Sequence, residues 1–189
     1  MASLFEETSE LPSGLTYRPG LLSAFEEREL LSGIRGIELR EARYKGFTAH
    51  RRVASFGAGY DFDANELTPA PHLAPFLLPL RQRIAEWLGL DAEQFAYALV
   101  SEYRPGTQLG WHRDVPQFEM VVGVSLAGAA RMRFRPYPPR KGAPTFMLEL
   151  EPRSAYVLKD EARWGWQHSI PPTPCLRYSI TFRTRRKAP

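Results

Sequence analysis

The second half of the chain is a succession of short segments rich in Val, Ile, Leu, Tyr and Phe, none longer than eight residues and each bounded by Gly or Pro. Apolar segments of this length, separated by turn residues, are typical of β-strands. Eight strands are expected, over residues 96–103, 108–114, 120–127, 131–136, 146–151, 154–159, 165–170 and 177–184. Eight short strands at this spacing favour a double-sheet jelly roll over a parallel α/β sheet.

Two helices are expected before these strands. Ser23, with Glu26 three residues later, has the spacing of a capping box, and a partial apolar face follows. A second helix is expected from Pro79 to Gly89, with proline in its first turn, one apolar stripe and a glycine that can end it. We expect both N-terminal helices to support one sheet from outside, so the predicted fold class is mainly β with flanking helices.

The length of 189 residues predicts a single domain over residues 1–189, because single cores commonly contain about 100–200 residues. No repeat or long linker divides the chain. Residues 1–20 are expected to be an extended N-terminal arm and residues 21–95 to supply the helical support and a lid. Residues 96–184 would form the jelly-roll core, and residues 185–189 a basic tail.

Composition narrows the setting in which the chain works. Its one cysteine excludes an internal disulfide framework and a zinc cluster of the CxxC type. No secretory signal follows Met1, and the longest uncharged stretch, residues 67–80, is shorter than the ~20 residues of a membrane span. We therefore expect a cytoplasmic monomer with no membrane partner. The net charge of +4 is compatible with a nucleic-acid partner, although a solvated basic surface is the commoner explanation.

Several common catalytic motifs are absent from the sequence. It contains neither a phosphate-binding GxxxxGK[ST] loop nor the HExxH zinc motif, and Gly57-Ala-Gly59 lacks the third glycine of a dinucleotide-binding loop. Gly123-Val-Ser125-Leu-Ala127 is similar to a serine-hydrolase elbow. However, Ser125 lies inside an apolar strand rather than on a strand-to-helix turn, so we interpret it as an ordinary strand residue.

Histidine and carboxylate side chains occur in the strand region in a metal-binding pattern. His112 and Asp114 are two residues apart in one expected strand, so their side chains should point to the same side. His168, from a distant strand, can complete the two-histidine, one-carboxylate set that suits non-haem Fe(II). The alternative is that His112 and Asp114 only hydrogen-bond to each other or to a neighbour. Trp111 should point away from the metal, and we expect it in the core.

The last expected strand, residues 177–184, places two arginines on one face. Alternation puts Arg177 and Arg183, with Ser179 and Thr181, opposite an apolar face. Buried arginines need partners, and a dicarboxylate is a good one because the guanidinium fork matches carboxylate geometry. The alternative is a pair of surface arginines on an edge strand.

Five motifs follow one another in this part of the chain: Ser101-Glu-Tyr103-Arg-Pro-Gly106, Leu109-Gly-Trp-His112-Arg-Asp114, Val122-Gly-Val-Ser-Leu126, Trp166-Gln-His168 and Arg177-Tyr-Ser-Ile-Thr-Phe-Arg183. Together with the upstream Gly59-Tyr60-Asp-Phe62, they resemble the AlkB-type 2-oxoglutarate- and Fe(II)-dependent dioxygenases in order and approximate spacing. The resemblance covers about residues 57–184. It implies a double-stranded β-helix, which agrees with the jelly roll of eight core strands.

The resemblance also implies cofactors and site residues. Members of the family use Fe(II), 2-oxoglutarate as co-substrate, and O2. The metal ligands, which are the catalytic residues, would be His112, Asp114 and His168. The residues around 2-oxoglutarate would be Tyr103, Arg177, Arg183, Ser101 and Ser179. Arg177 would pair with the C5 carboxylate, Tyr103 would donate a hydrogen bond, and Arg183 would contact the C1 end or the substrate. The substrate side would include Tyr60, in the lid, and Phe62.

The activity implied by the resemblance is oxidative dealkylation of N-alkylated nucleobases in DNA or RNA, releasing formaldehyde, succinate and CO2. Two departures from the family pattern bear on this activity. Ser101 and Ser179 stand where members often have Asn, and no acidic residue follows Asp114 before Glu119, where nucleobase demethylases often carry one. A hydroxylase of a protein side chain or small molecule is therefore the alternative. A non-catalytic jelly-roll binding module is a third possibility.

Overall fold

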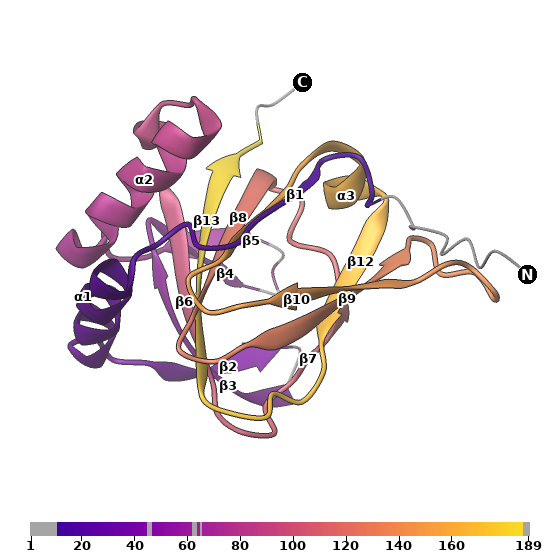
Figure 1. The fold of residues 1–189 in the computed structure, drawn as a ribbon, viewed down its shortest axis with the longest axis horizontal. Helices are drawn as coiled ribbons and strands as arrows, with labels where there is room; N and C mark the ends of the chain where they lie inside the picture. The colour runs from indigo at the N-terminus through magenta and orange to yellow at the C-terminus, as the bar shows by residue number, and fades with distance from the viewer. Residues whose placement is uncertain (1–10, 45–46, 62–63, 65, 187–189) are drawn as a thin grey trace, which may run out of the picture.

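Two antiparallel sheets packed face to face form the body of the protein (Figure 1). The structure is a computed structural model that describes residues 11–44, 47–61, 64 and 66–186. Over these residues the large sheet has seven strands in the order β1-β11-β8-β13-β6-β3-β2, and the small sheet has four in the order β10-β9-β12-β7. The prediction of a mainly β jelly roll is confirmed.

Each of the eight segments expected to be strands forms one. They are β6 (Tyr97–Tyr103), β7 (Leu109–His112), β8 (Phe118–Leu126), β9 (Ala130–Pro136), β10 (Phe146–Leu150), β11 (Ala155–Leu158), β12 (Trp166–Ile170) and β13 (Arg177–Arg185). Four of these strands, β6, β8, β11 and β13, lie in the large sheet, and the other four lie in the small sheet. The chain therefore passes back and forth between the sheets, as a jelly roll requires.

The first half of the chain adds strands to this core. β1 pairs with β11, while β2 pairs with β3, which in turn pairs with β6. β4 and β5 pair with each other as a separate hairpin. The bounds are β1 (Leu15–Arg18), β2 (Arg40–Tyr44), β3 (Phe47–Phe56), β4 (Ala58–Asp61) and β5 (Glu66–Pro69). The expected arm thus contributes a strand, while residues 1–10 of the arm and 187–189 of the expected tail lie outside the described residues.

Both expected helices form, and they lie along the outer face of the large sheet (Figure 1). α1 begins with the predicted capping box, in which the Ser23 hydroxyl accepts from the Glu26 N–H at 3.2 Å and the Glu26 carboxylate accepts from the Ser23 N–H at 2.7 Å. α2 ends at Gly89, whose φ of 65° is left-handed. The helical elements are α1 (Ala24–Arg35), η1 (Pro75–Leu77), α2 (Leu78–Leu88), η2 (Ala92–Gln94) and α3 (Asp160–Trp164), the η elements being 3₁₀ turns.

Alternation along the strands creates two hydrophobic cores. One lies between the helices and the large sheet and includes Ile180 and Phe182 of β13, both completely buried. The other lies between the two sheets and includes Val121 of the large sheet and Met132 and Phe134 of the small sheet. Burying a side chain of this size contributes about 1.5–3 kcal/mol each. The intervening residues of β13 are polar and face the small sheet, so they lie inside the jelly roll.

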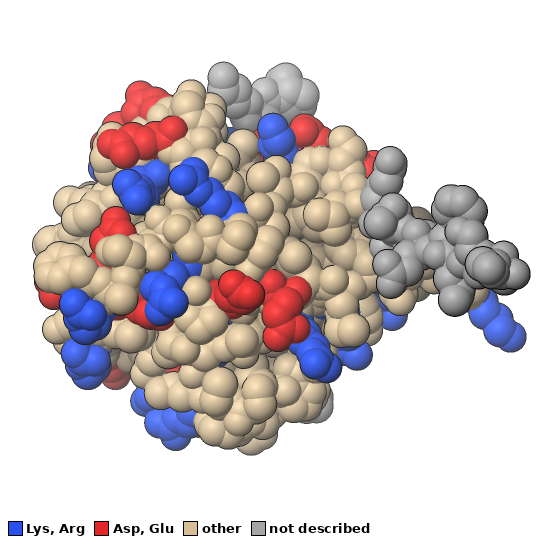
Figure 2. All heavy atoms as spheres, viewed as in Figure 1, with Lys and Arg blue, Asp and Glu red and all other residues tan. Residues whose placement is uncertain are grey.

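The surface is mixed in charge on the face shown in Figure 2, where Lys and Arg side chains are interspersed with Asp and Glu side chains. The excess of positive charge in the sequence is therefore not gathered into one large field on that face. None of the helices in the described part of the chain is long and apolar enough to cross a membrane.

Candidate metal centre and co-substrate pocket

The two histidines of the predicted triad face each other across a strand pair. β7 and β12 are antiparallel neighbours, and His112 is the direct cross-strand partner of His168. Their ring centroids lie 4.3 Å apart in an edge-on arrangement. His168 is buried, while His112, at the end of the edge strand β7, is half-buried. The register of one strand pair therefore brings together two imidazoles that are 56 residues apart (168 minus 112) in the chain.

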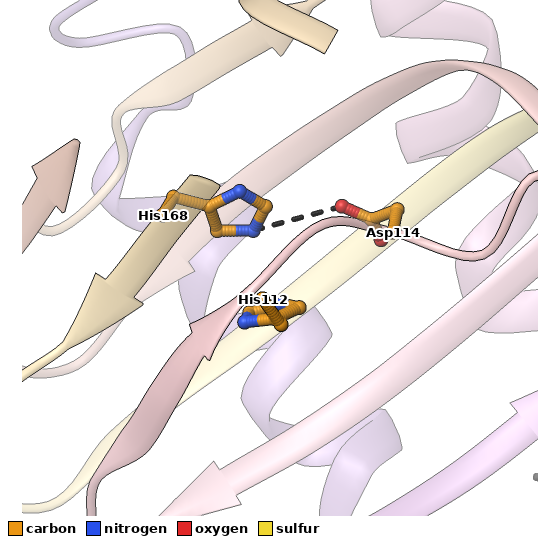
Figure 3. A group of neighbouring side chains, drawn as sticks. All are labelled: His112, Asp114 and His168. Atoms are coloured by element: carbon orange, nitrogen blue, oxygen red, sulfur yellow. Dashed lines mark ion pairs between the residues drawn. The ribbon is translucent and has the colours of Figure 1, made fainter. Parts of the chain in front are cut away.

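The Asp114 side chain also lies beside the two histidines, although Asp114 follows the end of β7. The sequence predicted a strand over residues 108–114, but β7 ends at His112, so simple alternation does not place the carboxylate. Asp114 Oδ2 nevertheless lies 3.6 Å from His168 Nε2, and one ligand atom from each of the three side chains lies within 4.8 Å of the others (Figure 3). This spacing allows one ion to contact all three side chains.

The loop that carries Asp114 is held by a buried arginine. The Arg163 guanidinium, from α3, donates to the backbone carbonyls of Asp114 at 3.1 Å, Val115 at 2.8 Å and Phe118 at 2.9 Å. Arg163 is only 2% exposed. These hydrogen bonds explain why Asp114 remains beside the histidines although its strand has ended. The sequence reasoning did not identify Arg163, because the contact joins residues nearly 50 positions apart.

The orientation of His112 leaves one ring nitrogen available. Its Nδ1 lies 2.8 Å from the carbonyl oxygen of Gly110, which can only accept a hydrogen bond. Nδ1 must therefore carry the proton, and Nε2 keeps its lone pair. A backbone carbonyl commonly fixes the tautomer of metal-binding histidines in this way.

The protonation states of the triad suit a divalent cation. Burial, together with the neighbouring His112, lowers the pKa of His168 to about 3, although the charge of Asp114 acts upward. Burial likewise lowers the pKa of His112. For Asp114 burial acts upward, but Arg183 and the two histidines outweigh it and hold the pKa well below its usual range. At neutral pH the triad thus offers two neutral imidazoles and one carboxylate, which is a donor set that suits non-haem Fe(II).

Arg183 contacts the triad itself. Its Nη2 and Nε lie 3.3 and 3.4 Å from Asp114 Oδ1. Arg183 therefore binds one oxygen of the Asp114 carboxylate, while the other oxygen, Oδ2, faces His168. The Arg183 guanidinium also lies over the Phe118 ring, 5.4 Å from the centroid. The expected contact of Arg183 with the C1 end of 2-oxoglutarate or with the substrate stays a prediction.

Arg177 is buried inside the jelly roll. It is 2% exposed, it donates from Nε to Ser125 Oγ at 2.9 Å, and its guanidinium lies 5.0 Å from the centroid of the Tyr103 ring. Within the described residues no carboxylate pairs with it. The alternative of a surface arginine on an edge strand is wrong, because β13 lies between β8 and β6.

A row of three buried serines lies beside Arg177. Ser179 of β13 is the cross-strand partner of both Ser101 in β6 and Ser125 in β8. Ser101, Ser125 and Ser179 are 2%, 1% and 4% exposed. Ser125 lies inside β8, as the sequence indicated, and its hydroxyl oxygen also accepts the hydrogen bond from Arg177, which the sequence did not indicate. Strand alternation could have identified this contact. Ser125 and Gly123 lie on the same face of β8, and they are the cross-strand partners of the inward-facing Ser179 and Thr181 of β13.

Two further side chains reach this interior from strands that the sequence did not connect to it. Arg51 of β3 donates from Nη1 to the Tyr103 hydroxyl at 3.4 Å, and Tyr103 is 3% exposed. Tyr156 of β11 is buried, and burial raises its pKa, reinforced by the charge of Asp114. Tyr156 therefore stays a neutral phenol within electrostatic reach of both Asp114 and Arg177.

The expected substrate-side residues are only partly described. Tyr60 lies in β4, is half-buried and pairs with Leu67 of β5 in the separate hairpin. Phe62 lies outside the described residues. Trp111 does point to the opposite side of the small sheet from His112, but it is not in the core. It is partly exposed, and the guanidinium groups of Arg133 and Arg135 cover it.

Comparison with protein families identifies one match over most of the chain. The model of the 2OG-Fe(II) oxygenase superfamily matches residues 14–183. The matched region contains the whole triad and every residue of the expected co-substrate pocket.

Curated relatives are about 30% identical to this chain over the aligned residues. Uncharacterized protein L905 of Acanthamoeba polyphaga mimivirus is 31% identical over 140 residues, covering 65% of this chain and 63% of that protein. The alkylated DNA repair protein ALKBH8 homolog of Arabidopsis thaliana is 29% identical, covering 89% and 54%. The tRNA (carboxymethyluridine(34)-5-O)-methyltransferase ALKBH8 of Mus musculus is 28% identical, covering 86% and 25%. The chain thus spans less than two thirds of each relative.

Solved structures share the fold at much lower identity. The structure of OsALKBH1 superposes with a TM-score of 0.63 at 15% identity, covering 93% of this chain and all of that one. A Pseudomonas putida prolyl-4-hydroxylase superposes with a TM-score of 0.59 at 17% identity, covering 92% and 93%. At these identities the likeness shows the fold alone.

Proposed function

The chain belongs to the 2OG-Fe(II) oxygenase superfamily, and from this premise we propose that it is an AlkB-type dioxygenase that removes N-linked alkyl groups from nucleobases in DNA or RNA. Fe(II), 2-oxoglutarate and O2 are the cofactors and co-substrates of the superfamily. We assign His112, Asp114 and His168 as the metal ligands. His112 would bind through Nε2, because its Nδ1–H is directed at the Gly110 carbonyl.

The buried guanidinium of Arg177 is the single observation that carries the co-substrate assignment. A buried charge without a partner costs several kcal/mol, so a cation of this kind is kept where an anion completes it. The Nε of Arg177 is already bound to Ser125, which leaves its terminal nitrogens for the far carboxylate of 2-oxoglutarate. Tyr103, whose ring lies beside that guanidinium, would donate its hydroxyl to the same molecule. Ser101 and Ser179 would line the 2-oxoglutarate pocket next to Arg177.

The chemistry follows from the family's cofactors. When bound, Fe(II) with 2-oxoglutarate and O2 supplies the oxidation of a C–H bond, in which one oxygen atom enters the alkyl group as a hydroxyl and the other enters succinate as CO2 is lost. The hydroxymethyl product then breaks its C–N bond, and the hydroxyl proton passes to the ring nitrogen as formaldehyde leaves. The residues of this chain orient the partners, since Arg177 fixes the co-substrate and Arg183 holds the Asp114 carboxylate toward His168.

A nucleic-acid substrate is supported by the relatives. Two of them carry names that refer to alkylated DNA repair and to tRNA modification, and each aligns with more than four fifths of this chain. A base within a duplex must leave the stack to reach a metal centre that is largely buried, and single-stranded substrates avoid that cost of a few kcal/mol. We therefore expect single strands to be preferred over duplexes.

Anaerobic reconstitution with Fe(II) and 2-oxoglutarate, followed by O2 and a panel of N-methylated single-stranded oligonucleotides, tests this proposal. Mass spectrometry should show loss of a methyl group from one member of the panel, matched by an equal amount of succinate. Arg177→Gln should lose both products, and Arg35→Gln, on the distant helix α1, should lose neither. Failure of the wild-type protein to bind 2-oxoglutarate would instead support a jelly-roll binding module.

A second candidate function keeps the oxygenase chemistry and changes the substrate. The segment after Asp114 reads Val115-Pro116-Gln117-Phe118, without the acidic residue that nucleobase demethylases often have there. This favours a hydroxylase of a protein side chain or small molecule. Succinate formation that nucleic acid neither stimulates nor inhibits at low salt would support this candidate against the first.

A further inference from the structure

The outer face of the small sheet, together with the residues that directly follow β7 and β9, carries a group of stacked arginines and aromatic rings, which we call the arginine–tryptophan face: Trp111, Arg113, Arg133, Arg135 and Tyr137. We propose that this face binds the sugar-phosphate backbone of the nucleic-acid strand whose modified base enters the metal centre. The inference rests on the proposed function, which it deepens by assigning the surface that holds the rest of the substrate.

The strand register places three of these side chains, those of Trp111, Arg133 and Arg135, on the opposite side of the sheet from the metal-binding histidines. His168 of β12 is the cross-strand partner of His112 in β7 and of Phe134 in β9, and these three residues face the interior. Their sequence neighbours Trp111, Arg133 and Arg135 therefore face outward. β7 is an edge strand of the small sheet. A chain lying across the outer face would thus need only to pass the edge of β7 to reach His112.

The guanidinium groups are stacked on aromatic rings. Arg135 and Arg133 lie 4.5 and 5.1 Å from the centroid of the Trp111 ring, and Arg113 lies 3.7 Å from that of Tyr137. Such cation–π contacts stabilise an arginine side chain and hold the plane of its guanidinium group in one orientation. The arginine side chains are therefore preorganised in one conformation.

Hydrogen bonds to neutral groups hold these arginines further. The Nε of Arg135 donates to Gln167 Oε1 at 2.8 Å, the Nε of Arg133 donates to Ser169 Oγ at 3.1 Å, and Arg113 donates to the carbonyl of Trp164 at 2.9 Å.

No carboxylate among the described residues forms an ion pair with Arg113, Arg133 or Arg135. Arg131 of the same strand does pair with Glu149, at 3.4 Å. Three fixed positive charges therefore have no ion-pair partner in the part of the chain that the structure describes, with Arg113 exposed and Arg133 and Arg135 half-buried.

This combination matches a nucleic-acid strand. Arginine binds phosphate bidentately, and terminal nitrogens remain for it because Nε already holds a neutral partner in Arg133 and Arg135. Half-exposed aromatic rings beside the charges, such as Tyr137 at 43% exposed, offer stacking platforms for bases. An acidic peptide would pair with the positive charges, but its carboxylates would not stack on the aromatic rings as nucleobases do. We therefore assign the face to single-stranded DNA or RNA.

The test measures binding of a fluorescently labelled single-stranded oligonucleotide of about 15 nucleotides, as DNA and as RNA, over a range of salt concentrations. Each phosphate contact to a single strand changes the slope of log K against log salt by about 0.7. The double variant Arg133→Ala/Arg135→Ala should therefore reduce the magnitude of that slope by about 1.4. Its affinity at low salt should fall at least tenfold, while anaerobic 2-oxoglutarate binding should equal that of the wild type.

Two controls keep the outcome interpretable. Arg28→Ala/Arg35→Ala removes two exposed arginines of α1, one of them also over an aromatic ring, and should leave affinity and slope unchanged. Arg133→Lys/Arg135→Lys keeps the charges and should keep most of the slope. Equal slopes for the wild type and the Arg133→Ala/Arg135→Ala variant would overturn the assignment. Correct slopes without removal of any methyl group would overturn the proposed function and leave the binding face standing.

Discussion

The Tyr156 ring lies directly on Gly123, its cross-strand partner in β8. A Cβ atom at residue 123 would lie 2.3 Å from the ring and 2.5 Å from the Tyr156 hydroxyl oxygen, distances that no real side chain tolerates. The absence of a side chain at residue 123 thus gives a buried tyrosine its place between the two sheets. That place is within electrostatic reach of Asp114 and Arg177.

Substituting Gly123→Ala should lower the free energy of unfolding by about 1–3 kcal/mol, because the added methyl group must displace a ring enclosed by the core. Urea unfolding of the metal-free protein measures this effect. Gly110→Ala is the matched control, since nothing lies within 4 Å of a Cβ there. In a Tyr156→Leu background the cost of Gly123→Ala should shrink, and an unchanged cost would show that the clash lies elsewhere.

His112→Ala should lower Fe(II) affinity by more than about 100-fold, since loss of an outer partner alone typically costs 10–100-fold. Anaerobic titration with Fe(II) measures the change, and circular dichroism checks the fold. His72→Ala removes an exposed histidine and should bind Fe(II) as the wild type does. Wild-type affinity in the His112→Ala protein would remove His112 from the ligand set.

Arg177→Gln should weaken 2-oxoglutarate binding by about 10- to 100-fold, because a hydrogen bond to a charged group is worth about 1.5–3 kcal/mol. Ser125→Ala should weaken it by about fivefold, since it frees the Arg177 Nε that Ser125 now holds. Both effects are measured by anaerobic titration of the Fe(II)-loaded protein. Fe(II) affinity should be unchanged in both variants, and a parallel loss of metal would mean that the pocket as a whole had been disturbed.

Glu102→Gln should lower the free energy of unfolding by about 2 kcal/mol at pH 7. Glu102 is 5% exposed and accepts two hydrogen bonds of 2.8 Å from Arg52 and one of 3.0 Å from Arg104. The hydrogen bonds from Arg52 lower the pKa of Glu102, against the upward effect of burial.

The stabilisation that ionised Glu102 gives to the folded protein should decrease as the pH falls. The unfolded chain takes up a proton at the ordinary pKa of Glu, while the folded carboxylate stays ionised to lower pH. Its stabilisation is therefore present above pH 4.5 and is lost as the pH falls through the lowered value. The difference between wild type and Glu102→Gln, measured by urea unfolding, should be larger at pH 7 than at pH 4. A difference that is independent of pH would show that packing, not charge, sets the cost.

Much of the fold was predictable because the strands obey local rules. Eight apolar segments bounded by Gly and Pro became eight strands, and the capping box at Ser23 formed as expected. β1 was read only as an extended arm, since four residues of mixed polarity carry no periodic signal, and pairing with β11 decides their structure.

The candidate site was predictable to the extent that alternation governs it. Arg177 and Ser179 face inward as the pattern of β13 indicates. Asp114 lies beyond the end of β7, so its position depends on Arg163 and Arg183, which arrive from distant segments. For Trp111 the direction was correct and the environment wrong, because alternation says which face a residue occupies and not whether anything covers that face.

The pairing of β1 with β11 has a consequence for solubility. All four residues of β11 are buried, so this strand would be an apolar, unpaired edge of the large sheet if β1 were missing. Sheet edges of this kind recruit other chains through their free backbone groups. Residues 15–18 therefore protect this apolar edge: by pairing with β11 they keep it from pairing with the same edge of a second copy of the chain.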